Sequence, residues 1–252
     1  MMSPMNAVAS VTAFTHRGRV RGRNEDTVVI GDWVSAPKME APRAVRHELS
    51  TPLLCAVCDG MGGHRVGAVA SRHVARRLAD ERERIADARA AAETLAAIDA
   101  ELYRLMAADA NLLGMGTTVV GLVLTPRLIW FNVGDSRLYR QRGARIEQIS
   151  IDDTPPGPRS GVITQSLGGA LPPQAIAPHV GAEDLPVPAR FVLCSDGLTD
   201  MLDDADIAEC LKLADADAVM QLFDLAMRAG GADNISIVLA SVPGRAGGPP
   251  AG

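Results

Sequence analysis

Short apolar runs of strand length dominate the chain, and longer stretches with helical spacing interrupt them. The runs are rich in Val, Ile and Leu and are bounded by Gly, Pro or charged residues, which is typical of strands. They lie at residues 7–14, 26–34, 53–58, 117–125, 127–133, 136–141, 145–150, 190–195 and 234–242. Apolar residues three or four positions apart predict helices at residues 66–78, 95–105, 203–214 and 217–229.

The order of these elements is strands, a helix pair, many strands, a second helix pair and a final strand. Helices segregated from meander-like strands favour an α+β layered domain over a doubly wound sheet. Residues 7–242 are therefore expected to form one domain. Residues 35–52 are rich in Pro and charge and are predicted to be a loop-like insert. Residues 243–252 contain too few apolar side chains to fold and are predicted to be a disordered tail.

Composition narrows the class of protein. Of the 252 residues, 47% are hydrophobic and 22% are charged, which is the balance of a soluble domain with a real core. A net charge of −5 without a basic stripe argues against a nucleic-acid partner. No apolar run approaches the roughly 20 residues of a membrane span, and the first residues lack the pattern of a secretory signal. We therefore expect a cytoplasmic protein with no membrane contact.

The cysteines are too few for a disulfide framework in a chain of this length. Cys55 and Cys58 form a CxxC pair, which could be half of a zinc site or a redox pair. They also lie in a strand pattern, where positions i and i+3 face opposite sides of the sheet. Buried structural thiols are the favoured interpretation for Cys55, Cys58, Cys194 and Cys210.

Acidic residues recur beside the ends of the apolar runs. They are Asp59, Asp196, Asp233, the pair Glu25 and Asp26, and Asp135 in a tight turn. A single Asp before Gly is most simply a turn residue or a helix cap. For several such residues that explanation is weaker, because like charges are buried together only when a cation compensates them. Oxygen ligands alone favour hard divalent ions such as Mg²⁺ or Mn²⁺.

Several longer motifs resemble one known family. In chain order they are "GRVRGRNED", "VCDGMGGHRVGAVAS", "GTTVVGLVL", "NVGDSRLYRQR", "VLCSDGLTDML" and "ADNISIVL". Between about Arg17 and Val242 the chain resembles the bacterial metal-dependent Ser/Thr protein phosphatases of the protein phosphatase 2C-like family. The resemblance implies a four-layer α-β-β-α sandwich, in which two antiparallel sheets are flanked by helix pairs, with a two-metal site at one end.

The resemblance also implies a set of metal ligands. Asp59 would bridge two Mn²⁺ or Mg²⁺ ions, and the carbonyl oxygen of Gly60 would bind one of them. Asp196 and Asp233 would hold one metal. Glu25 and Asp26 would complete the site, directly or through water.

Further roles follow from the same resemblance. Arg21 matches the family's phosphate-binding arginine, and guanidinium binds phosphate oxygens bidentately. Asp135 is either a ligand of a third, weaker ion that it shares with Asp196, or only a turn residue. Met61 stands where eukaryotic relatives have a histidine, so a water on the metal or His64 would supply the proton for the leaving group.

The chain departs from the family after residue 150. Asp152, Asp153 and Thr154 replace the usual Asp-His-Ser, and most of the flap that helps to select substrates is absent.

The predicted function is hydrolysis of phosphoserine and phosphothreonine in proteins by a metal-activated water. The expected partners of this monomer are phosphoproteins, a cognate Ser/Thr kinase among them. The alternatives are a catalytically silent phospho-binding module and a structural metal domain, but the latter leaves Arg21 without a purpose.

Overall fold

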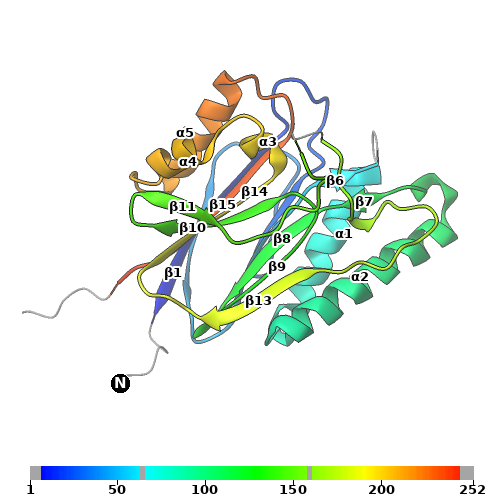
Figure 1. Ribbon diagram of the computed structural model, residues 1–252, viewed down its shortest axis with the longest axis horizontal. Helices are drawn as coiled ribbons and strands as arrows, with labels where there is room; N and C mark the ends of the chain where they lie inside the picture. Colours follow the sequence, from blue (N-terminus) through cyan, green and yellow to red (C-terminus); the bar gives the residue numbers. More distant parts are fainter. Residues whose placement is uncertain (1–6, 63–65, 158–160, 245–252) are drawn as a thin grey trace, which may run out of the picture.

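Two six-stranded antiparallel sheets lie face to face in the computed structural model, which describes residues 7–62, 66–157 and 161–244 (Figure 1). The first sheet has the order β11-β10-β14-β15-β1-β4. Its strands are β1 (Val8–His16), β4 (Arg43–Glu48), β10 (Arg137–Arg142), β11 (Arg145–Gln148), β14 (Ala189–Cys194) and β15 (Ile235–Val242). Because β1 pairs with β15, the first and last strands of the domain lie side by side within this sheet.

The second sheet has the order β13-β9-β8-β5-β2-β3. Its strands are β2 (Thr27–Ile30), β3 (Trp33–Val34), β5 (Leu53–Cys58), β8 (Val119–Leu124), β9 (Arg127–Val133) and β13 (His179–Asp184). A small third sheet joins β6 (Gly60–Met61), β7 (Gly116–Thr117) and β12 (Leu167–Gly168).

Helices cover the outer face of each sheet (Figure 1). The long helices α1 (Val66–Glu81) and α2 (Ala88–Ala108) pack on the second sheet, and short 3₁₀ turns follow them at Arg82–Arg84 and Ala110–Leu112. The helices α3 (Asp196–Thr199), α4 (Asp204–Cys210) and α5 (Asp215–Arg228) pack on the first sheet. The expected four-layer α+β sandwich is therefore confirmed.

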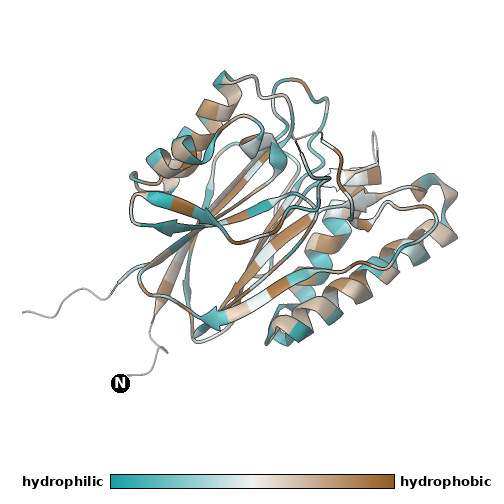
Figure 2. Ribbon diagram, viewed as in Figure 1, coloured by the Kyte–Doolittle hydropathy of each residue, from teal (hydrophilic) through white to brown (hydrophobic). Residues whose placement is uncertain are grey.

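Three apolar layers separate these four layers of structure, and the sheets are accordingly rich in hydrophobic residues (Figure 2). Strand β5 shows why, because all six of its residues are buried. Leu54 and Cys58 face the helices α1 and α2, whereas Leu53 and Cys55 face the core between the sheets. The CxxC cysteines thus lie in different layers. All four cysteines are buried free thiols, as predicted.

Several predicted boundaries were wrong: the helix expected at 203–214 ends at Cys210 in α4, and the strand expected at 117–125 is divided between β7 and β8. Residues 26–34 form two strands instead of one, because Gly31, with φ of +60°, allows a tight turn between β2 and β3. The predicted loop at 35–52 contains β4, which pairs with β1 at the edge of the first sheet. Its residues are mostly exposed, so its sequence lacks the apolar content of the inner strands. Strand β13 was not predicted either, because it is also an edge strand and its residues are half-buried or exposed and partly polar.

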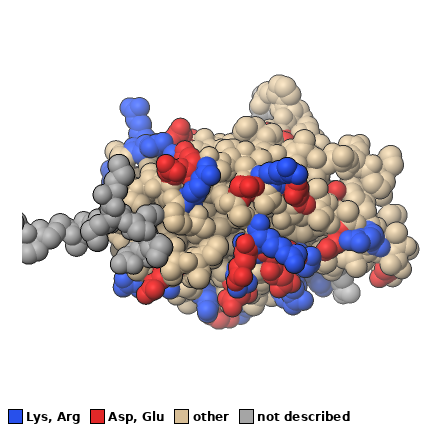
Figure 3. Space-filling model, turned by 90° about the horizontal axis from the view of Figure 1, so that it is seen from below, with Lys and Arg blue, Asp and Glu red and all other residues tan. Residues whose placement is uncertain are grey.

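Charges of both signs are mixed on the face shown in Figure 3. On the helices, Arg77 contacts Glu81 and Glu101, and Arg89 contacts Glu93. Among the described residues, no helix is long and apolar enough to cross a membrane. Most of the predicted tail, residues 245–252, lies outside the described residues.

Candidate metal centre

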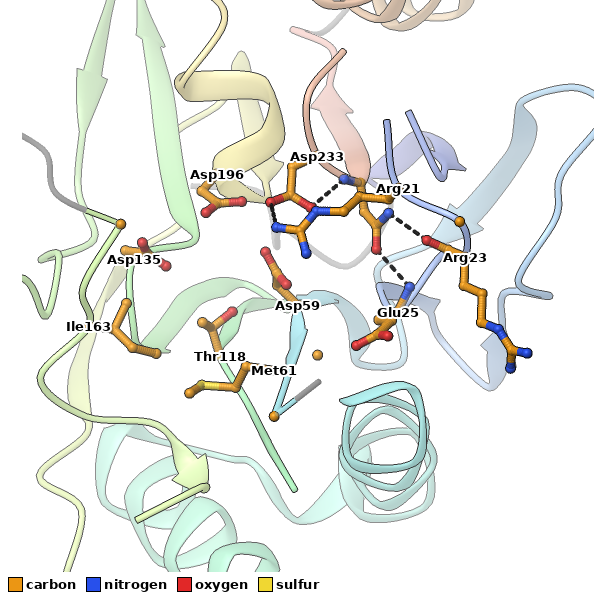
Figure 4. A pocket seen from close by; sticks show the side chains of 15 residues that line it. Arg21, Arg23, Glu25, Asp59, Met61, Thr118, Asp135, Ile163, Asp196 and Asp233 are labelled. Carbon is orange, nitrogen blue, oxygen red and sulfur yellow. Dashed lines mark hydrogen bonds and ion pairs between the residues drawn. The ribbon is translucent and has the colours of Figure 1, made fainter. Parts of the chain in front are cut away.

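A cavity of about 560 Å³ opens at one end of the sandwich, and carboxylates line it. The acidic lining residues are Glu25, Asp59, Asp135, Asp196 and Asp233. Figure 4 shows the side chains of Asp59, Asp196 and Asp233 pointing toward one another. Asp59 directly follows β5 of the second sheet, whereas Asp196 follows β14 and Asp233 precedes β15 of the first sheet. The stacking of the two sheets therefore brings these carboxylates together.

Burial and repulsion by neighbouring carboxylates raise the pKa values of Asp59 and Asp196. The pKa of Asp59 is raised well above its ordinary value, first by burial and then by the charges of Asp26, Asp196 and Asp233. Burial, with Asp135 and Asp233, raises the pKa of Asp196 to about 7. The cavity thus has an excess of negative charge, and a bound cation would reduce the repulsion between its carboxylates.

Asp26 lies beneath the cavity and does not line it. Its side chain is buried, and its Oδ2 accepts hydrogen bonds from Ser195 Oγ at 2.9 Å and Ser236 Oγ at 2.6 Å. Burial raises the pKa of Asp26 to about 6, although these two hydrogen bonds oppose the shift. Its position fits an indirect role under the ligands better than direct ligation, whereas Glu25 reaches the cavity itself.

Asn234 fixes the loop that contains Arg21 and Glu25. Its Oδ1 accepts from the amide of Glu25 at 2.7 Å, and its Nδ2 donates to the carbonyls of Arg17 and Arg23 at 3.0 and 2.8 Å. This residue was not among those predicted from the sequence to build the site. Its place directly after Asp233 was the available signal.

The glycines of the corner after β5 are required by close packing. A Cβ on Gly60 would lie 2.3 Å from the carbonyl oxygen of Gly67, in the first turn of α1. A Cβ on Gly67 would lie 2.4 Å from Glu25 Oε2. Because only glycine fits at both positions, α1 can begin against the corner and leave the backbone of Gly60 at the cavity.

Arg21 points into the cavity and contacts Asp233 (Figure 4). Its Nη2 donates to Asp233 Oδ2 at 2.5 Å, although 58% of its side chain is exposed. Burial alone would lower the pKa of Arg21, but Asp233, Asp59 and Asp196 raise it. The predicted phosphate-binding residue thus lies at the carboxylate cluster and is partly open to solvent.

Asp135 lies at the far side of the cavity, in the turn between β9 and β10. Gly134 makes this turn with φ of +99°, and its amide donates to Asp153 Oδ2 at 2.8 Å. Asp153 also contacts His179 Nε2 at 2.8 Å, which ties the turn to β13. The shortened segment after residue 150 therefore supports the turn of Asp135, a role that was not predicted from the sequence.

The position that holds a histidine in eukaryotic relatives is Met61 in this chain. Met61 lines the cavity, but its thioether offers no proton. His64 lies outside the described residues.

The donor set fits hard divalent cations. The residues that converge offer carboxylate and carbonyl oxygens, and the buried atoms Asp26 Oδ1 and Asp196 Oδ1 have no hydrogen-bond partner. Among the described residues, no three His, Cys, Asp or Glu side chains already form a complete metal-binding group. The fit therefore rests on the chemistry of the donors, the shared cavity and the raised pKa values.

The two stacked sheets and the carboxylate-lined cavity at one end define a domain suited to holding cations, and comparison with known proteins identifies its family. The family model of protein phosphatase 2C matches residues 44–240, more than half of the chain. The chain therefore belongs to the protein phosphatase 2C family.

Bacterial phosphatases are among its relatives. Serine/threonine protein phosphatase PstP of Mycobacterium tuberculosis is 31% identical over 262 aligned residues, which cover 96% of this chain and 46% of that protein. The chain thus spans about half the length of this relative. Serine/threonine phosphatase stp of Listeria monocytogenes is 29% identical, over 89% of this chain and 92% of its own length.

Solved structures agree with the sequence relatives. The catalytic domain of PstP in complex with two manganese ions has a TM-score of 0.77 and 30% identity. The match covers 94% of this chain and 99% of that domain.

Proposed function

We propose that this chain hydrolyses phosphoserine and phosphothreonine in proteins and that it requires Mn²⁺ or Mg²⁺. The observation on which this proposal depends is the convergence of Asp59, Asp196 and Asp233 from two sheets on one cavity, with Arg21 beside them. Membership of the protein phosphatase 2C family supports it. The residues that would hold the ions are Asp59, Glu25, Asp196 and Asp233, together with the carbonyl oxygen of Gly60.

When bound, the ions would lower the pKa of water and polarise the phosphoryl group. The chain's own residues position the reactants. Arg21 would orient the phosphate by exchanging its contact with Asp233 for phosphate oxygens. Asp26, held by Ser195 and Ser236, would keep the carboxylates above it in place. The thiols are not needed as nucleophiles, and burial raises the pKa of Cys58 beyond the reach of neutral pH.

The direct test is phosphate release from a phosphothreonine peptide in EDTA, Mg²⁺ or Mn²⁺. We expect turnover with either metal, at least as fast with Mn²⁺, and none in EDTA. The Asp59→Asn variant should lose nearly all turnover and still melt cooperatively. Full wild-type activity in excess EDTA would refute the proposed function, and an unfolded Asp59→Asn variant would refute its catalytic assignment.

The proposal extends to partners. Substrates would be the phosphoproteins made by a bacterial Ser/Thr kinase, and the chain would act as a monomeric signalling enzyme in the cytoplasm. Light scattering tests the oligomeric state. Dephosphorylation of a kinase activation loop tests the partner.

A further inference from the structure

A second cavity, of about 620 Å³, lies next to the candidate metal centre and shares Arg23 with it. We call it the basic pocket after its lining residues His16, Arg17, Arg23 and Lys38. No acidic residue of the described chain lines it. Its walls come from the end of β1, the loop that follows, the insert after β3 and the first turn of α1, where Val69 is exposed.

One loop presents cations to both cavities. Arg21 points toward Asp233, whereas the side chain of Arg23, two residues later, points away from the carboxylates (Figure 4). The backbone of Arg23 is held at this point of the loop, because its carbonyl accepts from Asn234 Nδ2 at 2.8 Å. A peptide whose phosphate contacts Arg21 would therefore have the basic pocket directly across this loop.

The basic pocket is built by buried polar contacts. Asn24 is buried, and its Nδ2 donates to Thr15 Oγ1 at 2.7 Å and to the carbonyl of Pro37 at 3.1 Å. These bonds hold the insert, and with it Lys38, against the loop. His16 Nδ1 accepts from the amide of Gly18 at 3.0 Å, so a neutral His16 has its proton on Nε2 and is a donor there.

Little negative charge balances these cations. Lys38 contacts Glu40 at 2.6 Å, but both side chains are about 80% exposed, and such surface pairs are weak. Among the described residues, no carboxylate pairs with Arg17 or Arg23; Arg17 donates to the carbonyl of Arg21. Burial, followed by the charges of Arg17 and Lys38, lowers the pKa of His16. The pocket thus differs from the face in Figure 3, where opposite charges lie together.

We propose that the basic pocket binds a second anionic side chain, phosphorylated or carboxylic, of the same protein segment whose phosphoserine or phosphothreonine enters the metal centre. The inference rests on the proposed function and specifies its substrates as acidic or multiply phosphorylated segments. Arg23 and Lys38 would contact the second anion, and His16 Nε2 would donate to it.

The test compares phosphothreonine peptides that differ in their flanks. One set has alanine around the phosphothreonine, one has glutamate and one has a non-hydrolysable phosphonate, placed two to four residues before or after it. The kcat/KM with Mn²⁺ is measured for wild type, Arg23→Ala and Lys38→Ala. The matched control is Arg46→Ala, which removes an exposed cation from β4 at the opposite end of β1.

We expect the anionic flank to raise wild-type kcat/KM about three- to tenfold, and Arg23→Ala and Lys38→Ala to remove most of that preference. Arg46→Ala should keep it. The ratio of glutamate to phosphonate peptides distinguishes the two anions. Equal preference in all four proteins, or an equal loss in Arg46→Ala, would overturn the proposal.

A binding measurement distinguishes failure of this inference from failure of the proposed function. Fluorescence anisotropy in EDTA measures the affinity of the same peptides without turnover. Weaker binding of the phosphonate peptide to Lys38→Ala than to Arg46→Ala supports the basic pocket even if no peptide is hydrolysed, in which case the proposed function fails alone. Equal affinities in this arm, with normal hydrolysis, overturn the basic pocket alone.

Discussion

Replacing Asp196 by asparagine should stabilise the metal-free protein at neutral pH. Its carboxyl lies next to Asp59, and burial with neighbouring charges raises its pKa to about 7 from an ordinary 3.8. Because the folded state prefers the protonated form, stability should fall as pH rises from about 4 to about 7. The neutral, isosteric amide of Asp196→Asn removes this dependence and can donate to Asp59.

The size of the effect follows from the raised pKa. A rise from 3.8 to about 7 corresponds to about 4 kcal/mol of unfolding free energy, as an upper limit, since the carboxylates titrate together. We expect Asp196→Asn to gain roughly 1–4 kcal/mol in EDTA at pH 8, or roughly 2–16 °C in Tm for a domain of this size. Near pH 4 the gain should vanish. Added Mn²⁺ should reverse the order, because metal binding stabilises the wild type and the variant has lost a ligand.

The measurement is thermal and urea unfolding from pH 4.5 to 8, in EDTA and in Mn²⁺. Asp224→Asn, which removes an exposed carboxylate from α5, is the matched control and should change little. The reasoning is refuted if Asp196→Asn in EDTA shows the same pH dependence as wild type and no gain at pH 8.

Three further outcomes are expected. Arg21→Ala should mainly raise KM for phosphopeptide, because its phosphate contact exists in the ground state; unchanged KM with a large loss of kcat would contradict this. Asn234→Ala should lower the unfolding free energy by about 2–3 kcal/mol in urea titrations, because it removes three hydrogen bonds of a buried amide. Wild-type stability of this variant would show that these hydrogen bonds are unimportant. Asp135→Ala should keep tight metal binding in calorimetry but lower turnover at millimolar metal. Wild-type rates at every metal concentration would make Asp135 only a turn residue.

Inner strands could be predicted from the sequence because both of their faces are buried. Strand β5 is apolar throughout, and β15 is apolar apart from two buried serines, so their sequences alone indicate their place. The edge strands β4 and β13 have one face toward solvent, and their polar sequences resemble loops. Their pairing with β1 and β9 depends on residues far away in the chain, which local patterns do not contain.

In the candidate site, too, some residues could be predicted from the sequence and others could not. Carboxylates at strand ends are conspicuous in a sequence, so Asp59, Asp196 and Asp233 could be proposed from the sequence alone. The neutral residues that hold them, such as Ser195 and Asn234, are ordinary polar residues whose partners lie more than 160 positions away in the chain. Their roles become visible only when the fold brings the segments together.

The position of the site across two sheets explains why so many neutral residues support it. Asp59 is attached to the second sheet, whereas Asp196 and Asp233 are attached to the first, so their spacing is set by how the sheets stack. Hydrophobic packing alone fixes such spacing only loosely, because it is non-directional. Asn234, on the first sheet, binds the backbone of Glu25 just before β2 of the second sheet, and Asp26 accepts from Ser195 and Ser236 across the same boundary. These directional bonds lock the two sheets together at the edge where the carboxylates must be held at fixed separations.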